Sequence, residues 1–183
     1  MTDTSGCVNM PATVLVAYTT RSGSTGEVAE AIGASIREVG FVTDVMPMQQ
    51  VVSLAGRLVI LGAPLYCGRF PKEFHQFVRV HREALEKLLP WCFVLGPTRK
   101  EPADFEGARK QATKQFARYP WLVPADVHVF GGRWNTKSLP FPFSMVRHLP
   151  GNPMGRIPAS DVRDWSEIQE WAIGVARQIK PAA

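Results

Sequence analysis

The sequence contains few cysteines and no long apolar run. Only three of its 183 residues are cysteine, which is too few for a disulfide framework. The longest largely apolar segment, Leu58–Cys67, has ten residues, whereas a membrane-spanning helix needs about 20. The start of the chain has no basic stretch followed by an apolar one, which is the pattern of a signal peptide. We therefore expect a cytoplasmic protein in a reducing compartment.

Several catalytic and nucleotide-binding motifs are also missing. The sequence has neither G-x-x-x-x-G-K-[ST] nor G-x-G-x-x-G, which argues against a P-loop NTPase and against the usual dinucleotide-binding fingerprint. It has no G-x-S-x-G nucleophile elbow. Its four histidines are not clustered at ligand spacing, so no metal site is predicted.

The excess of positive charge is concentrated in one segment. The chain has 21 basic and 16 acidic residues, a net charge of +5. No acidic residue lies between Asp126 and Asp161. That interval contributes four cations: Arg133, Lys137, Arg147 and Arg156. Charge alone does not indicate nucleic acid as a partner, and none is expected.

Short hydrophobic runs alternate with segments of helical spacing. The runs rich in β-branched residues predict strands over Thr13–Tyr18, Val42–Met46, Leu58–Ala63, Trp91–Leu95 and Val127–Phe130. Their nearly continuous hydrophobicity is typical of strands covered on both faces, as in a parallel sheet. Helices are predicted over Thr25–Val39, Pro71–Leu88, Phe105–Tyr119 and Asp164–Ile179. Such alternation predicts an α/β fold with a doubly wound parallel sheet.

Other local signals refine this prediction. Gly40 is expected to end the first helix, and residues 48–56 are ambiguous, with a short helix as one interpretation. The apolar stripe of the last helix includes Trp165 and is expected to be buried. Residues 1–11 are predicted to be a disordered tail, and residues 12–183 a single domain. Within it, residues 131–160 form a basic and apolar insert with five prolines.

The loop after the first strand carries the strongest functional signal. Residues Thr19–Gly26 read T-T-R-S-G-S-T-G and lead directly into a predicted helix. Free backbone N–H groups and the helix dipole favour an anion there, and the hydroxyl groups add donors. The pattern therefore indicates a phosphate monoester. A plain Ser/Thr N-cap is the alternative interpretation.

These residues also resemble a known family. Thr19–Thr25 resembles the FMN phosphate loop of flavodoxins. Leu61–Val78, Val129–Arg133 and Asp161–Ala172 resemble flavodoxin-like proteins grouped with menaquinone-dependent protoporphyrinogen oxidase. The resemblance implies a five-stranded parallel sheet of order 2-1-3-4-5 in a three-layer αβα arrangement, with bound FMN.

The resemblance assigns the cofactor site to three loops. The residues implied for the FMN phosphate are Thr20, Arg21, Ser22, Gly23, Ser24 and Thr25. Those implied for the isoalloxazine ring are Pro64, Leu65, Tyr66, Cys67, Gly68, Arg69, Gly96, Pro97, Thr98 and Arg99. No catalytic residue is assigned.

Individual side chains in these loops admit more than one interpretation. Tyr66 can stack on a flavin or cap the core. Gly68 permits a peptide to change orientation. Arg69 or Arg99 can stabilise negative charge on reduced flavin, although Arg69 is also compatible with a solvated surface cation. Cys67 is not expected to be a redox thiol, because a flavin would already carry the electrons.

The resemblance implies an FMN-dependent oxidoreductase that passes electrons between an organic substrate and a quinone or protein partner. Oxidation of protoporphyrinogen IX, a step of haem biosynthesis, is the specific expectation. An electron carrier of the flavodoxin type and a flavin-free binding module are the alternatives. Residues 139–150 are interpreted as a docking surface for a quinone or a porphyrin, as a peripheral contact with the inner face of an anionic membrane, or as a helix packed on the core.

Overall fold

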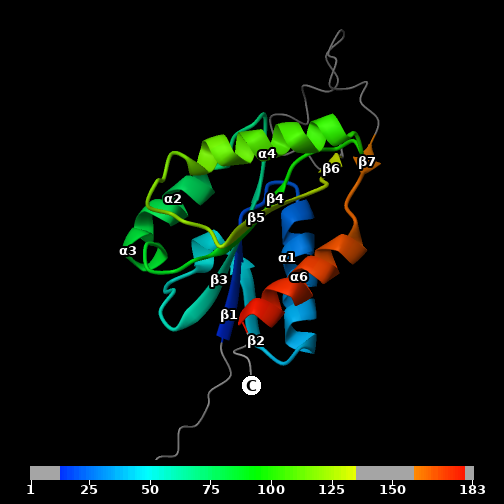
Figure 1. Ribbon diagram of the computed structural model, residues 1–183. Helices are drawn as coiled ribbons and strands as arrows, with labels where there is room; N and C mark the ends of the chain where they lie inside the picture. Colours follow the sequence, from blue (N-terminus) through cyan, green and yellow to red (C-terminus); the bar gives the residue numbers. More distant parts are fainter. Residues whose placement is uncertain (1–12, 135–158, 180–183) are drawn as a thin grey trace, which may run out of the picture.

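The computed structural model describes residues 13–134 and 159–179 of the chain (Figure 1). Five strands form one parallel sheet of order β2-β1-β3-β4-β5. They are β1 (Thr13–Tyr18), β2 (Val42–Pro47), β3 (Arg57–Pro64), β4 (Trp91–Leu95) and β5 (Asp126–Phe130). The predicted fold class and strand order are both confirmed.

The interior strand β1 pairs with a parallel neighbour on each side. Thr13 is in register with Val42 of β2 and with Arg57 of β3. Four consecutive residues of β1, Val14 to Ala17, are fully buried. Burial on both faces explains why this strand is hydrophobic without alternation.

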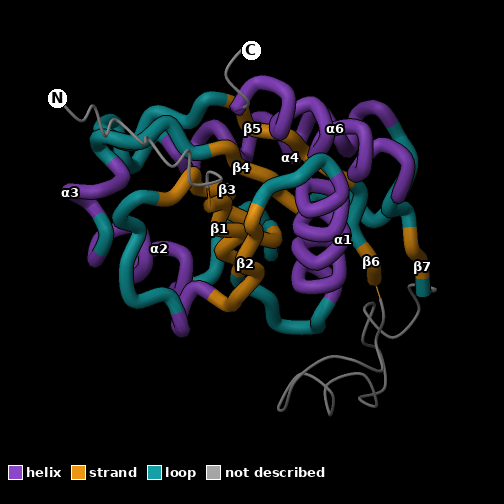
Figure 2. Tube along the Cα trace, turned by 90° about the horizontal axis from the view of Figure 1, so that it is seen from below, coloured by secondary structure: helices purple, strands orange, loops and turns teal. Residues whose placement is uncertain are grey.

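Helices cover both faces of the sheet, which makes three layers. They are α1 (Ser24–Glu38), α2 (Lys72–Val80), α3 (Arg82–Leu85), α4 (Pro102–Phe116) and α6 (Trp165–Ile179). Figure 2 shows α1 and α6 on one side of the strands and α2 and α3 on the other. Each side has its own core: Ile32 and Ile168 belong to one, and Phe74 and Phe116 to the other.

The structure refines three predicted features of the helices: the segment 71–88, the residues 48–56 and the helix end at Gly40. The segment predicted as one helix over 71–88 is two helices, because the backbone leaves helical geometry at His81 (φ −98°, ψ 21°). The ring of His81 packs against Phe77 there, with centroids 4.6 Å apart. The ambiguous residues 48–56 contain a short 3-10 helix, η1 (Met48–Gln50). Gly40 follows α1 with a φ of +99°, as expected for a helix stop.

The predicted burial of Trp165 is wrong. Its side chain is 42% exposed, since it is the first residue of α6 and lies at the end of the helix. The guanidinium of Arg163 lies over its ring instead, 4.6 Å from the centroid. A periodic pattern identifies the face of a helix but not where along its axis the core ends.

Two short strands frame the predicted insert. β6 (Arg133–Trp134) and β7 (Ser160–Asp161) pair antiparallel, with Arg133 opposite Asp161 and Trp134 opposite Ser160. Figure 1 places them at the end of the sheet where the chain passes from β1 into α1. The rest of the insert, including residues 139–150, and the predicted tail lie outside the described residues.

The close packing of Gly62 in β3 generates a stability prediction. A Cβ atom built on Gly62 would lie 2.2 Å from the buried ring of Phe93. We therefore expect Gly62→Ala to lower the free energy of unfolding by about 1–3 kcal/mol, measured by urea denaturation.

Gly174, within α6, provides the matched control because a Cβ there meets nothing within 4 Å. Gly174→Ala should raise the free energy of unfolding by about 0.5–1 kcal/mol. Equal effects of the two substitutions would contradict the packing argument.

Candidate functional site

The three predicted cofactor loops meet at one edge of the sheet. They follow the carboxyl ends of β1, β3 and β4, which are neighbours in the strand order. Hydrogen bonds tie the start of the first two loops to the neighbouring strand: the N–H of Thr19 donates to the carbonyl of Gly62 in β3 (2.9 Å), and that of Leu65 to the carbonyl of Leu95 in β4 (2.8 Å). This edge is where ligands bind in open α/β sheets. Thirteen of the sixteen predicted site residues lie on these loops, Pro64 ends β3, and Ser24 and Thr25 begin α1.

The first loop ends in an uncapped helix N-terminus. Gly23 is the N-cap of α1, with a left-handed φ of +86°, and no side chain caps the helix. The first helical hydrogen bond runs from the N–H of Glu27 to the carbonyl of Gly23 (3.1 Å). The amides of residues 24–26 therefore have no intrahelical acceptor, and such free amides favour anion binding at a helix N-terminus. The alternative of a Ser/Thr N-cap is thereby ruled out.

A buried hydroxyl in this loop has no hydrogen-bond partner. Thr25 is fully buried, and its Oγ1 contacts no donor or acceptor within the described part of the chain. Leaving a buried polar group unpaired costs about 1–3 kcal/mol, and native proteins rarely leave such groups without a partner. Thr20 differs, since its hydroxyl oxygen accepts a hydrogen bond from the N–H of Gly23 (3.0 Å). The Thr25 hydroxyl therefore fits a bound phosphate oxygen.

The second loop contains a tight two-residue turn. Tyr66 and Arg69 exchange two backbone hydrogen bonds, each 3.0 Å long. Between them, Cys67 has a φ of +48° and Gly68 a φ of +74°, the pattern of a type I′ turn. A left-handed backbone is unfavourable for a residue with a Cβ such as Cys67. Strain of this kind collects at ligand-binding loops, where it sets the orientation of the flanking side chains.

Arg21 connects the first loop to the second. Its guanidinium carbon lies 5.3 Å from the ring centroid of Tyr66, a cation–π contact. Tyr66 is half-buried and Arg21 is exposed. The contact holds one aromatic ring and one cation together at the mouth of the site.

The third loop is held by the strands that frame the insert. The carbonyl of Pro97 accepts a hydrogen bond from the N–H of Gly132 (2.6 Å). The carbonyl of Thr98 accepts one from the hydroxyl of Ser160 (2.8 Å). Arg99 extends outward, with 75% of its side chain exposed and an ion pair to Asp104 (2.9 Å). Segments distant in sequence thus fix the third loop.

A cluster of four charges lies beside the first loop. Glu27 accepts two hydrogen bonds from Arg133, of 3.0 and 2.7 Å, and one from Arg163, of 2.7 Å. Arg163 also donates from Nε and Nη2 to Asp161, at 2.8 and 2.5 Å. This network joins the first turn of α1 to β6, to β7 and to the segment that precedes α6.

Burial and ion pairing act in opposite directions on the cluster. Burial alone would raise the pKa of Glu27, but hydrogen bonds from Arg163 and Arg133 lower it below its ordinary value. The hydrogen bond from Arg163 also lowers the pKa of Asp161, against a smaller effect of burial. Both carboxylates are therefore ionised at neutral pH.

Sequence reasoning did not identify this cluster. Arg133 belongs to one of the quoted family motifs, but no role was assigned to it. Its partner Glu27 is 106 residues away, and Arg163 is 136 residues from Glu27. The only local signal was an acidic residue in the first turn of a helix, which is common everywhere.

Two other polar contacts lie away from the three loops, one between α2 and the turn after α4 and one between β5 and α6. His75 Nδ1 and the Tyr119 hydroxyl are 2.7 Å apart. Burial, followed by the nearby charges of Arg118 and Arg79, lowers the pKa of His75, so its ring is neutral at pH 7. On the other face His128 Nε2 lies 2.9 Å from Glu167 of α6.

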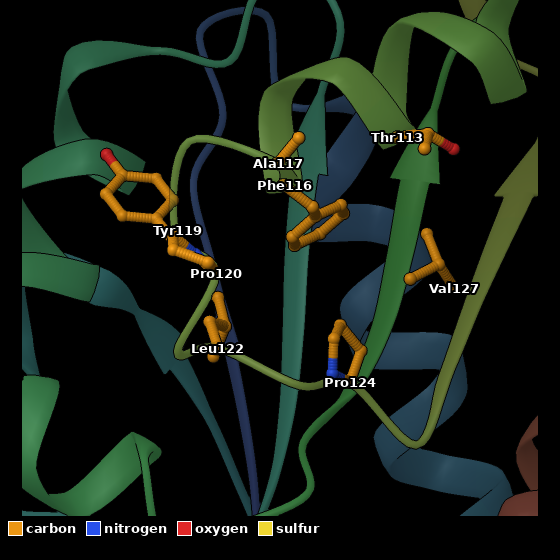
Figure 3. A pocket seen from close by; sticks show the side chains of 8 residues that line it. All are labelled: Thr113, Phe116, Ala117, Tyr119, Pro120, Leu122, Pro124 and Val127. Atoms are coloured by element: carbon orange, nitrogen blue, oxygen red, sulfur yellow. The ribbon is translucent and has the colours of Figure 1, made fainter.

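One apolar pocket lies at the opposite end of the strands (Figure 3). Its volume is about 300 Å³. It is formed by the end of α4, the following loop and the start of β5, with Phe116 and Leu122 among its lining residues. No predicted site residue lines it, so it is separate from the three loops.

Comparison with known proteins agrees with the geometry. Residues 15–144 match the family model described as a flavodoxin domain. The chain is similar to protoporphyrinogen IX dehydrogenase [quinone] of Escherichia coli (strain K12), with 19% identity over 172 residues, 88% of this chain and 93% of the relative.

Two solved structures share the fold. Oxidised flavodoxin 1 from Bacillus cereus superposes with a TM-score of 0.55 and 14% identity, over 92% of this chain and 99% of its own. Rubredoxin oxygen:oxidoreductase from Desulfovibrio gigas superposes with a TM-score of 0.52 and 12% identity. That match covers 92% of this chain and 36% of the larger protein.

The charge cluster generates a prediction about pH. The pKa values of Glu27 and Asp161 are lowered by folding, so the cluster stabilises the protein above the ordinary carboxyl range and loses this effect as the pH falls through the lowered values. At pH 7 we expect Glu27→Gln to lower the free energy of unfolding by about 1 kcal/mol. At a pH well below the lowered pKa of Glu27, wild type and variant should be equally stable.

Denaturant titrations at several pH values measure this difference. The exposed pair Arg82–Glu86 (2.8 Å) is the control, and Glu86→Gln should change stability by only about 0.3–0.5 kcal/mol at neutral pH. A difference between wild type and Glu27→Gln that persists at low pH would mean that the carboxylate charge is not the cause.

Proposed function

Because the chain belongs to the flavodoxin domain family, we propose that its three loops bind FMN non-covalently and that it is an FMN-dependent oxidoreductase. The observation that carries the proposal is the buried, unpartnered hydroxyl of Thr25 beside the uncapped N-terminus of α1. A phosphate monoester supplies both the negative charge and the oxygen acceptors that this arrangement lacks.

Each loop has a distinct part in this proposal. The amides of residues 24–26 and the hydroxyl of Thr25 bind the phosphate. Tyr66 stacks on the isoalloxazine ring, and the strained turn that contains Cys67 and Gly68 fixes the position of Tyr66. Residues 96–99 form the other wall of the ring site. When bound, FMN supplies the redox chemistry, accepting a hydride or single electrons, and the protein supplies position and electrostatics.

The substrate proposal is protoporphyrinogen IX, with a quinone or a protein as electron acceptor. The similarity to protoporphyrinogen IX dehydrogenase [quinone] over most of both chains supports it. Exposed cations on all three loops also favour an anionic substrate: Arg21, Arg69, Arg99 and Lys100. Propionate groups on a porphyrinogen would complement these charges.

An electron carrier without its own substrate is the second candidate. The match to flavodoxin 1 favours it, because it covers 92% of this chain and 99% of that protein. The basic charge distinguishes the two, since +5 overall is unsuited to docking on a basic partner. A flavin-free binding module is the third candidate, and a colourless protein that ignores added FMN would support it.

The location of the protein is also a proposal. Among the helices of the described segments, none is both long enough and apolar enough to cross a membrane. We propose a cytoplasmic location. Contact of residues 139–150 with an anionic membrane surface stays a prediction, because that segment lies outside the described residues.

Replacing the Thr25 hydroxyl by a methyl group tests the phosphate site. Thr25→Val removes a hydrogen bond to a charged group, worth about 1.5–3 kcal/mol, so FMN should bind about 10- to 150-fold more weakly. The apoprotein should be no less stable, because the hydroxyl has no partner there. Quenching of flavin fluorescence on titration gives the dissociation constant.

Thr25→Ser keeps the hydroxyl and is the matched control, with an expected affinity within about threefold of wild type. If Thr25→Val bound FMN as tightly as wild type does, the loop could not be the phosphate site. The absorbance bands of bound flavin, near about 375 and 450 nm, provide an independent check.

Turnover under anaerobic conditions separates the enzyme from the carrier. With bound FMN, a quinone and protoporphyrinogen IX, we expect repeated conversion to the fluorescent porphyrin, at a rate that falls with rising ionic strength because exposed cations attract the substrate. A carrier would instead oxidise at most one two-electron equivalent of protoporphyrinogen IX per bound FMN. Porphyrin fluorescence measures both outcomes.

A further inference from the structure

Glu27 places a negative charge where an anion is expected to bind. It lies in the first turn of α1, and its Oε1 is 4.0 Å from the position of a Cβ built on Gly23. An acidic side chain interacts well with a helix N-terminus, but it repels a second anion at the same end. Two unit charges about 4 Å apart interact with about 1 kcal/mol in water and about 4 kcal/mol near a protein surface. An unpaired Glu27 would therefore weaken phosphate binding.

Both carboxylate oxygens of Glu27 are paired with arginines. Arg133 holds the two oxygens in a bidentate arrangement, at 3.0 and 2.7 Å, and Arg163 adds a third hydrogen bond of 2.7 Å. Bidentate and charge-assisted bonds of this kind are among the strongest in proteins. The negative charge beside Gly23 is thus compensated by two cations from the other end of the chain.

Arg163 is held rigidly in this arrangement. Only 3% of its side chain is exposed. Asp161 accepts three hydrogen bonds from it, two from the guanidinium and one from the backbone N–H. The ring of Trp165 covers the guanidinium at 4.6 Å. The cation therefore needs no rearrangement, and little entropy is lost, when an anion arrives.

The charges of the cluster sum to zero. Glu27 and Asp161 contribute two negative charges, and Arg133 and Arg163 two positive ones. Removing one arginine leaves a net charge of −1 next to the amides of α1. Removing Glu27 leaves a net charge of +1 there. The two substitutions should therefore change anion affinity in opposite directions.

We propose that Arg133 and Arg163 are positioning residues that neutralise Glu27 and thereby allow the N-terminus of α1 to accept a phosphate dianion. This inference rests on the proposed FMN site. It also links the phosphate site to the β6–β7 pair, because Arg133 lies in β6 and Asp161 in β7. The framing strands of the insert and the phosphate loop form one electrostatic unit.

The test measures dissociation constants for FMN and for riboflavin, which lacks the phosphate. The variants are Arg133→Gln, Glu27→Gln and the double variant, and flavin fluorescence is the readout. Arg133→Gln should weaken FMN binding about 3- to 10-fold and leave riboflavin binding within about twofold of wild type. The loss should shrink at about 0.5 M salt, where charges are screened.

Charge rescue distinguishes this role from a structural one. Glu27→Gln should bind FMN at least as tightly as wild type, and the double variant should bind within about twofold of wild type. Arg82→Gln, which breaks the exposed pair with Glu86 far from the loops, is the control and should leave both affinities unchanged. Circular dichroism and denaturant unfolding confirm that each variant is folded.

Three results would overturn the inference while leaving FMN binding intact. These are an Arg133→Gln variant with unchanged FMN affinity, an equal loss for FMN and riboflavin, or a double variant as weak as Arg133→Gln. If Arg133→Gln does not fold, the FMN affinity of Glu27→Gln is the deciding measurement. An FMN affinity of Glu27→Gln more than about threefold below wild type refutes the inference. A wild-type protein that binds no FMN would overturn this inference and the proposed function together.

Discussion

The burial of β1 and β3 on both faces is the constraint on which the rest of the structure depends. Parallel strands cannot be joined by tight hairpins, so each must be followed by a crossover that covers the sheet. These crossovers place every strand-to-helix loop at the same edge. Because β1, β3 and β4 are adjacent, the three loops that follow them lie side by side. The geometry of the site is therefore a consequence of how the core is buried.

Within that frame, the site combines groups that would be unfavourable elsewhere. A fully buried hydroxyl on Thr25 has no partner, and Cys67 adopts a left-handed backbone. The N-terminus of α1 has no side-chain cap. Each of these lowers the stability of the protein by itself, and a bound phosphate and ring would compensate them. Their concentration on adjacent loops is what distinguishes a binding site from an ordinary edge of a sheet.

The fold is shared with flavodoxins, so it does not decide between an enzyme and a carrier. Local electrostatics carry that information instead. Exposed cations surround the loops, whereas the acidic Glu27 is neutralised by arginines from distant segments. The surface therefore presents positive charge around the loops, while the carboxylates of Glu27 and Asp161 are paired with arginines. Such an arrangement favours an anionic substrate or partner at the mouth of the site.

The strand order and the second and third cofactor loops were implied by the resemblance to a family. The sequence by itself determined the strands, the end of the first helix near Gly40 and the hydroxyl-rich first loop. These features arise from local patterns: hydrophobic runs, periodicity, and glycine or hydroxyl residues next to a strand. Their boundaries moved by only a few residues in the structure. The interruption at His81 and the exposure of Trp165 were not predictable, because each depends on what packs against the helix.

Only the tertiary structure decided the partners of Glu27. Nothing in the sequence near this residue indicates that Arg133 and Arg163 would meet it, 106 and 136 residues further along the chain. Electrostatic pairing depends on distances of a few ångström between side chains. Those distances are set by the crossovers and the β6–β7 pair, and a pattern of residue types along the chain does not contain them.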